Sequence, residues 1–376
     1  MTKDLAFYQQ NNYNIKEIEV IIDNIFEDYQ IINKLEGKKV LLKVNLLMGK
    51  SPDQAITTNP KFVTAVARIV KKYGGQPFLA DSPGGPFNKT SLKFAYSKSG
   101  YLEPAEAGEY ALNYDTGKFK LDSPEGYRSK SFEICNFVQE ADLIINLPKL
   151  KTHGLTLYTG AIKNLFGLVP GVTKAEYHLK LQNISDFCHM LIDLHDVITP
   201  ELTIMDGILG MEGEGPSSGI PREFKTIIAS NNAVYLDTVV SYLLRKDKYI
   251  NDPWPATIKA RDISIDFDQK IIPEAIKENF IDVKTPRVDK TSNLIDQQLP
   301  KPISKFIEKM VRPKPVVLDN CIACGICAKN CPARVITINE QAEIDLTDCI
   351  RCFCCQELCP HDAVEIKYPL LGRLLF

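Results

Sequence analysis

Nine of the eleven cysteines in this 376-residue chain lie between Cys321 and Cys359. Eight of the nine repeat one spacing, C-x2-C-x2-C-x3-C-P, first in CIACGICAKNCP and then in CIRCFCCQELCP. The chain starts with MTKDLAFYQQNNYN, which lacks the pattern of a secretory signal, so we expect a cytoplasmic protein without disulfide crosslinks. We therefore expect the cysteine-rich segment to fold around metal despite its small core.

The spacing inside each run predicts iron–sulfur ligation. Three thiolates at this spacing can bind one face of a cubane cluster, and the proline turns the fourth cysteine toward the other cluster. We therefore predict two 4Fe–4S clusters. The ligands of the first are Cys321, Cys324, Cys327 and Cys359, and those of the second are Cys349, Cys352, Cys355 and Cys331. Cys354 is interpreted as a thiol outside both sets, although it could replace Cys355 in a damaged cluster.

Two other interpretations of the cysteines stay open. A pair of zinc sites is disfavoured, because structural zinc sites usually pair two separated C-x2-C elements. Clusters that only stabilise the fold are also disfavoured, because one cluster would be enough for that purpose. Electron transfer is therefore the predicted function of this segment, although the spacing does not fix the reduction potentials.

The cysteine-rich segment resembles bacterial two-cluster ferredoxins. The segments VITINEQAEIDLTD and AVEIKY are expected to form the small strands that flank the clusters. From residue 316 to 376 the chain has 5 basic and 8 acidic residues, so its net charge is 5 − 8 = −3 before clusters are counted. An electron-transfer partner with a basic surface is expected, and the rest of the chain could supply that surface.

The sequence before this segment predicts a large α/β domain with a mostly parallel, doubly wound sheet. Asn59 and Pro60 fit the N-cap and the first position of one helix. We predict an α/β domain at residues 1–284, a proline-rich linker at 285–315 and a small α+β ferredoxin-like domain at 316–376. The expected strands are KKVLLKVNLL, QPFLAD, ADLIINL, ELTIMD and FKTIIAS, and the expected helices are NPKFVTAVARIVKKYGG, SDFCHMLIDLHDVI and AVYLDTVVSYLLRK.

Polar residues come directly after several of these strands. In doubly wound sheets, ligands bind beyond the carboxyl ends of the strands, so these polar loops are expected to gather at one edge. The loop ADSPGG is glycine-rich, but it matches neither the dinucleotide-binding nor the P-loop pattern and is only a weak sign of phosphate binding. We predict substrate-binding roles for Lys43, Asn45, Asp81, Ser82, Asn164 and His178.

The stretch NLPKLKTHGLTLYTGAIKNLFG has three lysines in apolar surroundings. Burying a lysine without a partner is costly, so a converged set of lysines predicts a bound carboxylate or phosphate. We predict that Lys149, Lys151 and Lys163 hold that anion and that His153 transfers protons. His153 and His178 are both expected to lie in loops. The alternatives are solvated lysines with structural hydrogen bonds, or a third metal bound by His153 and Asp81, which is disfavoured. His189 and His195 are interpreted as ordinary helix residues.

Several of these motifs together are similar to the domain-of-unknown-function family numbered 362. They are KVNLL, ITTNP, ADSPGG, the lysine-rich stretch, the run from Gly171 to His178 and DGILGMEGEGPSSG. The resemblance covers roughly Lys38 to Lys246. It implies a C-terminal ferredoxin-like module, which many members carry, and a redox protein of an anaerobe. It assigns no role to any residue.

Composition narrows the classes of function. The net charge of −2 gives no general attraction to nucleic acid or to an anionic membrane. No run of 18 apolar residues is present, and the apolar end PLLGRLLF is too short for a firm membrane anchor. We expect an iron–sulfur oxidoreductase that exchanges electrons with an anionic small molecule. The alternatives are a dedicated electron carrier or docking protein, and a non-redox enzyme with structural clusters. A symmetric homodimer is the default expectation.

Overall fold

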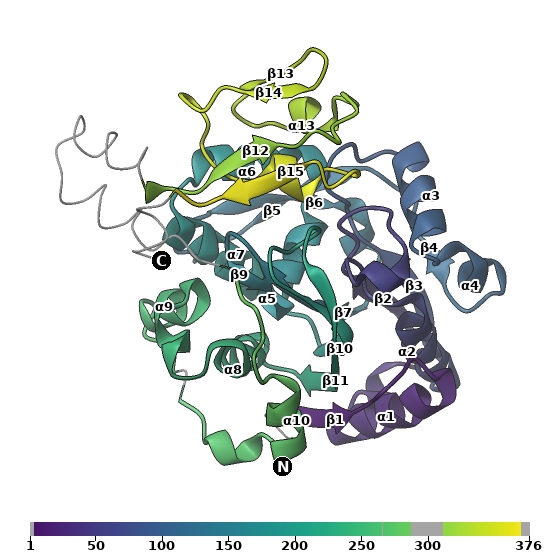
Figure 1. The fold of residues 1–376 in the computed structure, drawn as a ribbon. Coiled ribbons are helices and arrows are strands. Elements are labelled where there is room, and N and C mark those ends of the chain that lie inside the picture. The colour runs from purple at the N-terminus through teal and green to yellow at the C-terminus, as the bar shows by residue number, and fades with distance from the viewer. Residues whose placement is uncertain (1–3, 265, 287–310, 370–376) are drawn as a thin grey trace.

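The computed structural model describes residues 4–264, 266–286 and 311–369 (Figure 1). Most of the proline-rich linker predicted at residues 285–315 lies outside the described residues, as do residues 370–376 of the apolar C-terminal end. The first two ranges contain the α/β domain, and the third contains the ferredoxin-like domain.

A nine-stranded sheet runs through the described part of the α/β domain. The strands of this domain, including the separate hairpin β5–β6, are β1 (Ala6–Gln9), β2 (Lys39–Val44), β3 (Gln76–Ala80), β4 (Ala111–Leu112), β5 (Lys118–Asp122), β6 (Ser131–Cys135), β7 (Leu143–Leu147), β8 (Lys149–His153), β9 (Leu157–Thr159), β10 (Leu202–Glu212) and β11 (Ile220–Ser230). The main path has the order β1-β11-β10-β7-β2-β3-β4, and β8 and β9 extend from β10. The pairs from β10 to β4 along this path are parallel, whereas β11 pairs antiparallel with β10 and β1. The predicted fold class is therefore confirmed.

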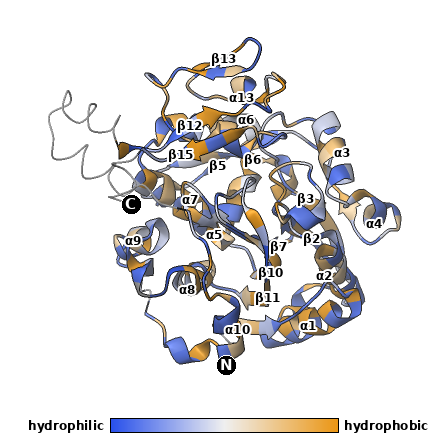
Figure 2. Ribbon diagram, viewed as in Figure 1, coloured by the Kyte–Doolittle hydropathy of each residue, from blue (hydrophilic) through white to orange (hydrophobic). Residues whose placement is uncertain are grey.

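Helices cover both faces of this sheet. The helices of the α/β domain are α1 (Ile15–Asp28), α2 (Pro60–Lys72), α3 (Lys89–Lys98), α4 (Leu102–Glu106), α5 (Ala161–Asn164), α6 (Gly171–Lys180), α7 (Ile184–Ile198), α8 (Ala233–Arg245), α9 (Pro253–Lys259) and α10 (Glu274–Asn279). Successive side chains of a strand point to opposite faces, and accordingly Val40 and Leu42 lie in one hydrophobic core while Leu41 lies in the other. Helices α1, α2 and α3 pack in the first core, and α5, α7, α8 and α9 in the second. Figure 2 shows α1 with both hydrophobic and hydrophilic stretches, as expected of a helix with one buried face.

The start of helix α2 agrees with its sequence. The side chain of Asn59 accepts a hydrogen bond from the Lys61 N–H at 2.9 Å, so Asn59 is the N-cap, and Pro60 occupies the first helical position. Because this helix begins directly after the loop that leaves β2, the cap also fixes the path of that loop toward the carboxyl edge of the sheet.

Two segments expected as loops are strands. Residues Lys149–His153 form β8, which pairs parallel with β10 and antiparallel with β9. Strand β10 continues through Glu212, well past the short apolar run that predicted it. All five residues of β8 are buried, including both lysines. The polar residues that suggested a loop therefore belong to a strand that is paired on both sides. His178, also expected in a loop, lies in helix α6.

The described part of the ferredoxin-like domain consists of two small two-stranded antiparallel sheets and two one-turn helices. Strand β12 (Lys314–Val317) pairs antiparallel with β15 (Val364–Lys367), and β13 (Ile336–Ile338) pairs antiparallel with β14 (Ala342–Ile344). The predicted strands in VITINEQAEIDLTD and AVEIKY are therefore confirmed. Helices α13 (Ile326–Lys329) and α14 (Cys354–Glu357) carry cysteines of the first and second run, respectively. In Figure 1 this domain lies at one end of the molecule, opposite α1 and α10.

Candidate iron–sulfur centre and adjoining pocket

The described part of the ferredoxin-like domain contains two small cavities lined by cysteines. Cavity I is lined by Cys321, Cys324, Cys327 and Cys359, and cavity II by Cys331, Cys349, Cys352 and Cys355 together with Cys354. Each has a volume of about 20 Å³. The fourth cysteine of each run thus lies with the first three of the other run. This is the grouping that the spacing predicted for the two ligand sets.

The backbone around these cavities repeats between the two runs. The residues two and four places after the first cysteine have positive φ in both copies: Ala323 and Gly325 in the first, Arg351 and Phe353 in the second. Backbone N–H groups approach sulfur from nearby positions, with Ala363 N 3.2 Å from Cys359 Sγ. Arg351 N lies 3.4 Å from Cys349 Sγ and Ala342 N 3.5 Å from Cys321 Sγ.

Thiolates that surround a cavity and receive backbone N–H bonds fit a cluster that carries its own sulfide and negative charge. In residues 4–264, 266–286 and 311–369, no three His, Cys, Asp or Glu side chains converge closely enough to bind a single metal ion. The four predicted ligands at each cavity, with these N–H donors, are compatible with an iron–sulfur cluster.

A larger pocket lies where the ferredoxin-like domain meets the α/β domain. Its volume is about 90 Å³, which is enough for several waters or a small ligand. Seven of the residues predicted to bind or act on a substrate line it: Asn45, Asp81, Ser82, Lys151, Lys163, Asn164 and His178. Lys43, Lys149 and His153 are absent from its lining.

The fold brings the lining residues together from separate parts of the chain. Asn45 comes directly after β2, and Asp81 and Ser82 come directly after β3, which is its parallel neighbour. Their side chains therefore emerge at the same edge of the sheet, as expected of loops that follow parallel strands. Lys174 and His178 are four residues apart in α6 and so share one face of that helix.

Two glycines allow the segment after α5 to pass close to the loop after β3. A Cβ atom at Gly167 would lie 2.0 Å from Asp81 Oδ1, and one at Gly171 would lie 2.3 Å from the Gly85 carbonyl oxygen. Neither contact could relax easily, because Asp81 is itself fixed by an ion pair and Gly85 O is backbone. The close approach places α5 and α6 directly over the carboxyl ends of β2 and β3.

Several buried polar atoms of the pocket lack a hydrogen-bond partner within the described chain. They are Asn45 Oδ1, Ser82 Oγ and Thr159 Oγ1, on residues that are each at least nine-tenths buried. The Lys163 ammonium, in the same lining, also has no hydrogen bond or ion pair to the described residues. Buried polar groups without partners are costly and are normally satisfied by water or a ligand. Water or a polar ligand in the pocket would satisfy these atoms.

Cationic side chains outnumber anionic ones in this pocket. Lys151, Lys163 and Lys174 face Asp81 and Glu357. Burial lowers the pKa of Lys163, and it lowers the pKa of Lys174 to about 8 although Asp81 opposes that change. An anion among these ammonium groups would raise their pKa values and favour the charged form.

Lys151 and Lys43 are each held by other groups of the chain. The Lys151 ammonium donates to the Ile56 carbonyl at 2.7 Å, and burial and Lys163 lower its pKa well below the usual range. Lys43 Nζ lies 3.2 Å from Asp81 Oδ1 and 2.6 Å from the Val44 carbonyl oxygen. Lys43 therefore lies behind Asp81 and holds that carboxylate in place, instead of contacting the pocket as predicted.

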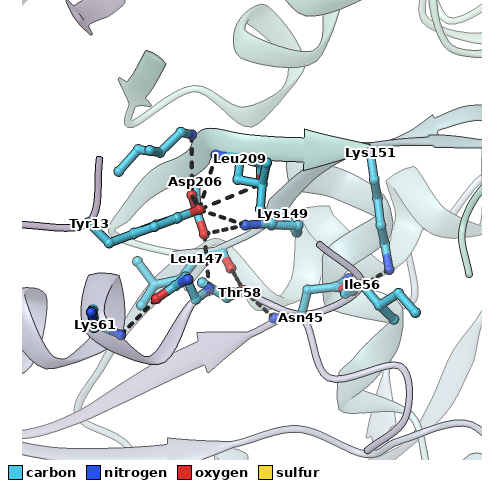
Figure 3. A network of polar contacts seen from close by, with 12 residues as sticks. Tyr13, Asn45, Ile56, Thr58, Lys61, Leu147, Lys149, Lys151, Asp206 and Leu209 are labelled. Carbon is cyan, nitrogen blue, oxygen red and sulfur yellow. Dashed lines mark hydrogen bonds and ion pairs between the residues drawn. The ribbon is translucent and has the colours of Figure 1, made fainter. Parts of the chain in front are cut away.

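Lys149 belongs to a separate polar network (Figure 3). Its ammonium lies 2.8 Å from Asp206 Oδ2 and 2.9 Å from the Tyr13 hydroxyl, which in turn donates to Asp206 Oδ1 at 2.8 Å. Asp206 also accepts the Asn59 N–H at 2.9 Å. In Figure 3 Lys149 points toward Asp206 and Tyr13, whereas Lys151 points toward Ile56. The structure thus gives Lys149 a buried ion pair in place of the anion predicted for it.

His153 connects the two domains and does not face the pocket. Its Nδ1 accepts the Leu155 N–H at 3.1 Å, so the ring proton lies on Nε2. Nε2 is 3.0 Å from Glu357 Oε1, so the two side chains are in close electrostatic contact. Burial, followed by repulsion from Lys163, lowers the pKa of His153 to about 4. Burial alone would raise the pKa of Glu357, but His153 and Lys163 lower it to about 2.

Helix α14 contributes several contacts between the domains. Gln356 Nε2 donates to the Glu214 carbonyl at 3.1 Å, and the Ser217 hydroxyl donates to the Gln356 carbonyl at 3.4 Å. Cys354, Glu357 and Leu358 complete one wall of the pocket. Both domains are therefore needed to build this site.

Sequence reasoning missed several residues of the pocket. They are Lys174, Thr159, Asn330, Cys354 and Glu357. Lys174 stands four residues before His178, so the helical spacing of that run could have revealed it. The last three come from the ferredoxin-like domain, and no local pattern indicates that they face a loop more than a hundred residues away.

Comparisons with known proteins agree with this architecture. Residues 40–242 match the family described as domain of unknown function (DUF362), and residues 320–363 match the 4Fe-4S dicluster domain. The chain is 38% identical over 262 residues to the thylakoid-associated protein sll1697 of Synechocystis sp., covering 69% of this chain and 77% of that protein.

One solved structure also shows a limited likeness. It is the lactate racemase apoprotein from Thermoanaerobacterium thermosaccharolyticum, with a TM-score of 0.39 and 14% sequence identity. The match covers 61% of this chain and 55% of that one. Among the residues that the structure describes, no helix is long and apolar enough to cross a membrane.

Replacing Lys149 with Met should leave the Asp206 carboxylate buried without its cation. We expect the free energy of unfolding to fall by about 3–5 kcal/mol, because an uncompensated buried charge is costly. The double variant Lys149→Met/Asp206→Asn removes that charge as well and should lose less. Urea unfolding followed by circular dichroism measures both variants. A double variant that is no more stable than Lys149→Met would contradict the ion pair.

The buried imidazole of His178 should make stability depend on pH. Burial, with Lys163 and Lys174, lowers its pKa from 6.5 to about 4, so between these values the unfolded chain binds a proton that the folded chain does not. Stability should therefore fall as the pH decreases through this window, by about 1.4 kcal/mol per pH unit for one group.

The matched variant for this prediction is His178→Phe, which keeps an aromatic ring beside Phe187, whose ring centroid is 4.7 Å away. Urea unfolding at about pH 7 and about pH 5.5 measures the effect. The variant should lose less stability than the original chain over this range. Equal losses would show that His178 is not a buried neutral group.

Proposed function

Because this chain belongs to the DUF362 family and carries a 4Fe-4S dicluster domain, we propose that it is an iron–sulfur oxidoreductase. Electron transfer through iron–sulfur chemistry is the role that this domain supports. The finer proposal is that electrons pass between two 4Fe–4S clusters and an anionic small molecule held in the interdomain pocket. The observation that carries it is one pocket lined both by unpartnered polar atoms of the α/β domain and by residues of the ferredoxin-like domain.

The cluster at cavity I would be held by the first three cysteines of run one and Cys359, and that at cavity II by the first three of run two and Cys331. When bound, such clusters take up and release single electrons. The chain's own residues provide the thiolates and the N–H donors at Ala342, Arg351 and Ala363.

The pocket would bind its ligand mainly through charge. Lys163 is the principal candidate for an anion contact, because its ammonium lines the pocket and lacks a partner in the described chain. Lys174 and Lys151 add positive charge, although each already donates to a backbone carbonyl, of Ser82 and Ile56 respectively. Ser82 Oγ and Thr159 Oγ1 could complete the hydrogen bonds of a carboxylate or phosphate.

The second candidate function is a dedicated electron carrier or docking protein with no catalytic site. The exposure of cavity I favours it, because Cys324 is exposed and Ile322 beside it is 61% exposed. We propose that an electron-transfer protein docks there, and that the chain works in the cytoplasm. The description of sll1697 as thylakoid-associated suggests that such a partner can also lie at a membrane surface. A homodimer stays a prediction.

Neighbouring cysteines provide a matched test of the cluster ligands. The anaerobically purified chain should contain about eight irons, and Cys355→Ser should contain fewer because it removes a thiolate of cavity II. Cys354→Ser, one residue away, should keep about eight irons. Iron analysis and the brown absorbance of the clusters give the answer. Loss of iron in Cys354→Ser with retention in Cys355→Ser would reverse the assignment.

Anion binding can be tested with the anaerobic holoprotein. We expect inorganic phosphate, acetate or another small phosphorylated or carboxylated metabolite to raise the unfolding temperature in a saturable way. Lys163→Gln should weaken that binding roughly tenfold or more, since a charge-assisted hydrogen bond contributes about 1.5–3 kcal/mol. The control Lys180→Gln changes an exposed lysine of the same helix as Lys174 and should bind normally. If no anion stabilises the protein, or if both variants behave alike, the proposed pocket ligand is wrong.

A further inference from the structure

The two cysteine-lined cavities differ in their relation to the pocket. Cys354 lines both cavity II and the interdomain pocket, so one side chain forms the wall between them. Within the described residues, the linings of cavity I and the pocket share no residue. Cavity I instead opens beside the exposed Ile322 and Cys324.

Charged groups of the pocket therefore lie close to cavity II. Lys163 lines the pocket together with Cys354 and interacts electrostatically with Cys354 and Glu357. Glu357 lies 3.0 Å from His153 Nε2, and Asp81 is paired with Lys43 at 3.2 Å. Lys151 and Lys174 each donate to a backbone carbonyl, whereas the ammonium of Lys163 has no hydrogen bond or ion pair to the described residues.

We propose that the charge held in the pocket selectively sets the reduction potential of the cluster in cavity II. This inference rests on the proposed function, because it takes both clusters and a charged pocket as given. One-electron reduction adds a negative charge to the cluster without making or breaking a bond. Lys163 favours that added charge and raises the potential, and an anion bound beside Lys163 opposes it and lowers the potential. The cluster in cavity I, on the outer side, serves as an internal reference.

The coupling must be reciprocal. If an anion lowers the potential of the cavity II cluster, reduction of that cluster must weaken binding of the anion by the matching factor. A tenfold preference of the anion for the oxidised protein corresponds to a shift of about 59 mV for a one-electron couple. Reduction would then favour release of the ligand, so the occupancy of the pocket would depend on the redox state of the cavity II cluster.

A redox titration of the anaerobic holoprotein, monitored by electron paramagnetic resonance, tests this inference. The variants Cys324→Ser and Cys352→Ser assign the two signals, because each removes a ligand of one cavity. We expect Lys163→Gln to move the cavity II potential to a more negative value and to leave cavity I nearly unchanged. Lys163→Arg, which keeps the charge, and Lys180→Gln, at an exposed site, should change neither.

The unaltered chain provides a second measurement that needs no variant at position 163. Saturating inorganic phosphate should lower the cavity II potential, and calorimetry should find weaker phosphate binding to the reduced protein. Phosphate that binds while both potentials stay fixed or shift equally would overturn the coupling and leave the proposed function intact. Absence of phosphate binding would count against the anion site, and the response to Lys163→Gln would still decide the coupling. Equal shifts of both clusters in that variant would overturn it.

Discussion

Burial of lysine side chains at the carboxyl edge of the sheet is the constraint on which the rest of the structure depends. An ammonium group cannot be buried there without compensation. Lys149 is compensated by Asp206 and Tyr13, and Lys43 by Asp81. These pairs hold the loops after β2, β3 and β7 in fixed positions. Lys163 lies at the same edge, but it has no such partner among the described residues. The arrangement that pairs Lys149 and Lys43 with carboxylates therefore leaves the charge of Lys163 available to a ligand.

The ferredoxin-like domain completes this arrangement. Without α14, the pocket would be open on the side that Cys354, Glu357 and Leu358 now cover. The contact is built from backbone and side-chain hydrogen bonds around Gln356, together with the approach of His153 to Glu357. The domain thus acts both as a candidate electron carrier and as a wall of the binding site.

The sequence predicted those features that are determined locally. The cysteine groups follow from spacing within short runs, and the N-cap at Asn59 follows from two adjacent residues. Strand β8 was mistaken for a loop because its lysines are buried through partners elsewhere in the chain. The role of Lys149 depends on Asp206, which is 57 residues away, and that of His153 depends on Glu357 in the other domain. Residues such as Cys354 become part of the pocket only when the two domains meet. The hydrophobic periodicity of a helix or strand does not predict such a contact between domains.

The joining of both modules in one chain has a consequence for specificity. A separate electron carrier could present either of its clusters to a substrate domain, depending on how it docks. Here the contacts of α14 fix the orientation, with cavity II against the pocket and cavity I toward solvent. In the proposed function, the inner position would expose one cluster to the charge of the ligand, and the outer position would leave the other open to a protein partner. The two cysteine-lined cavities have different surroundings because one short helix is docked in a single way.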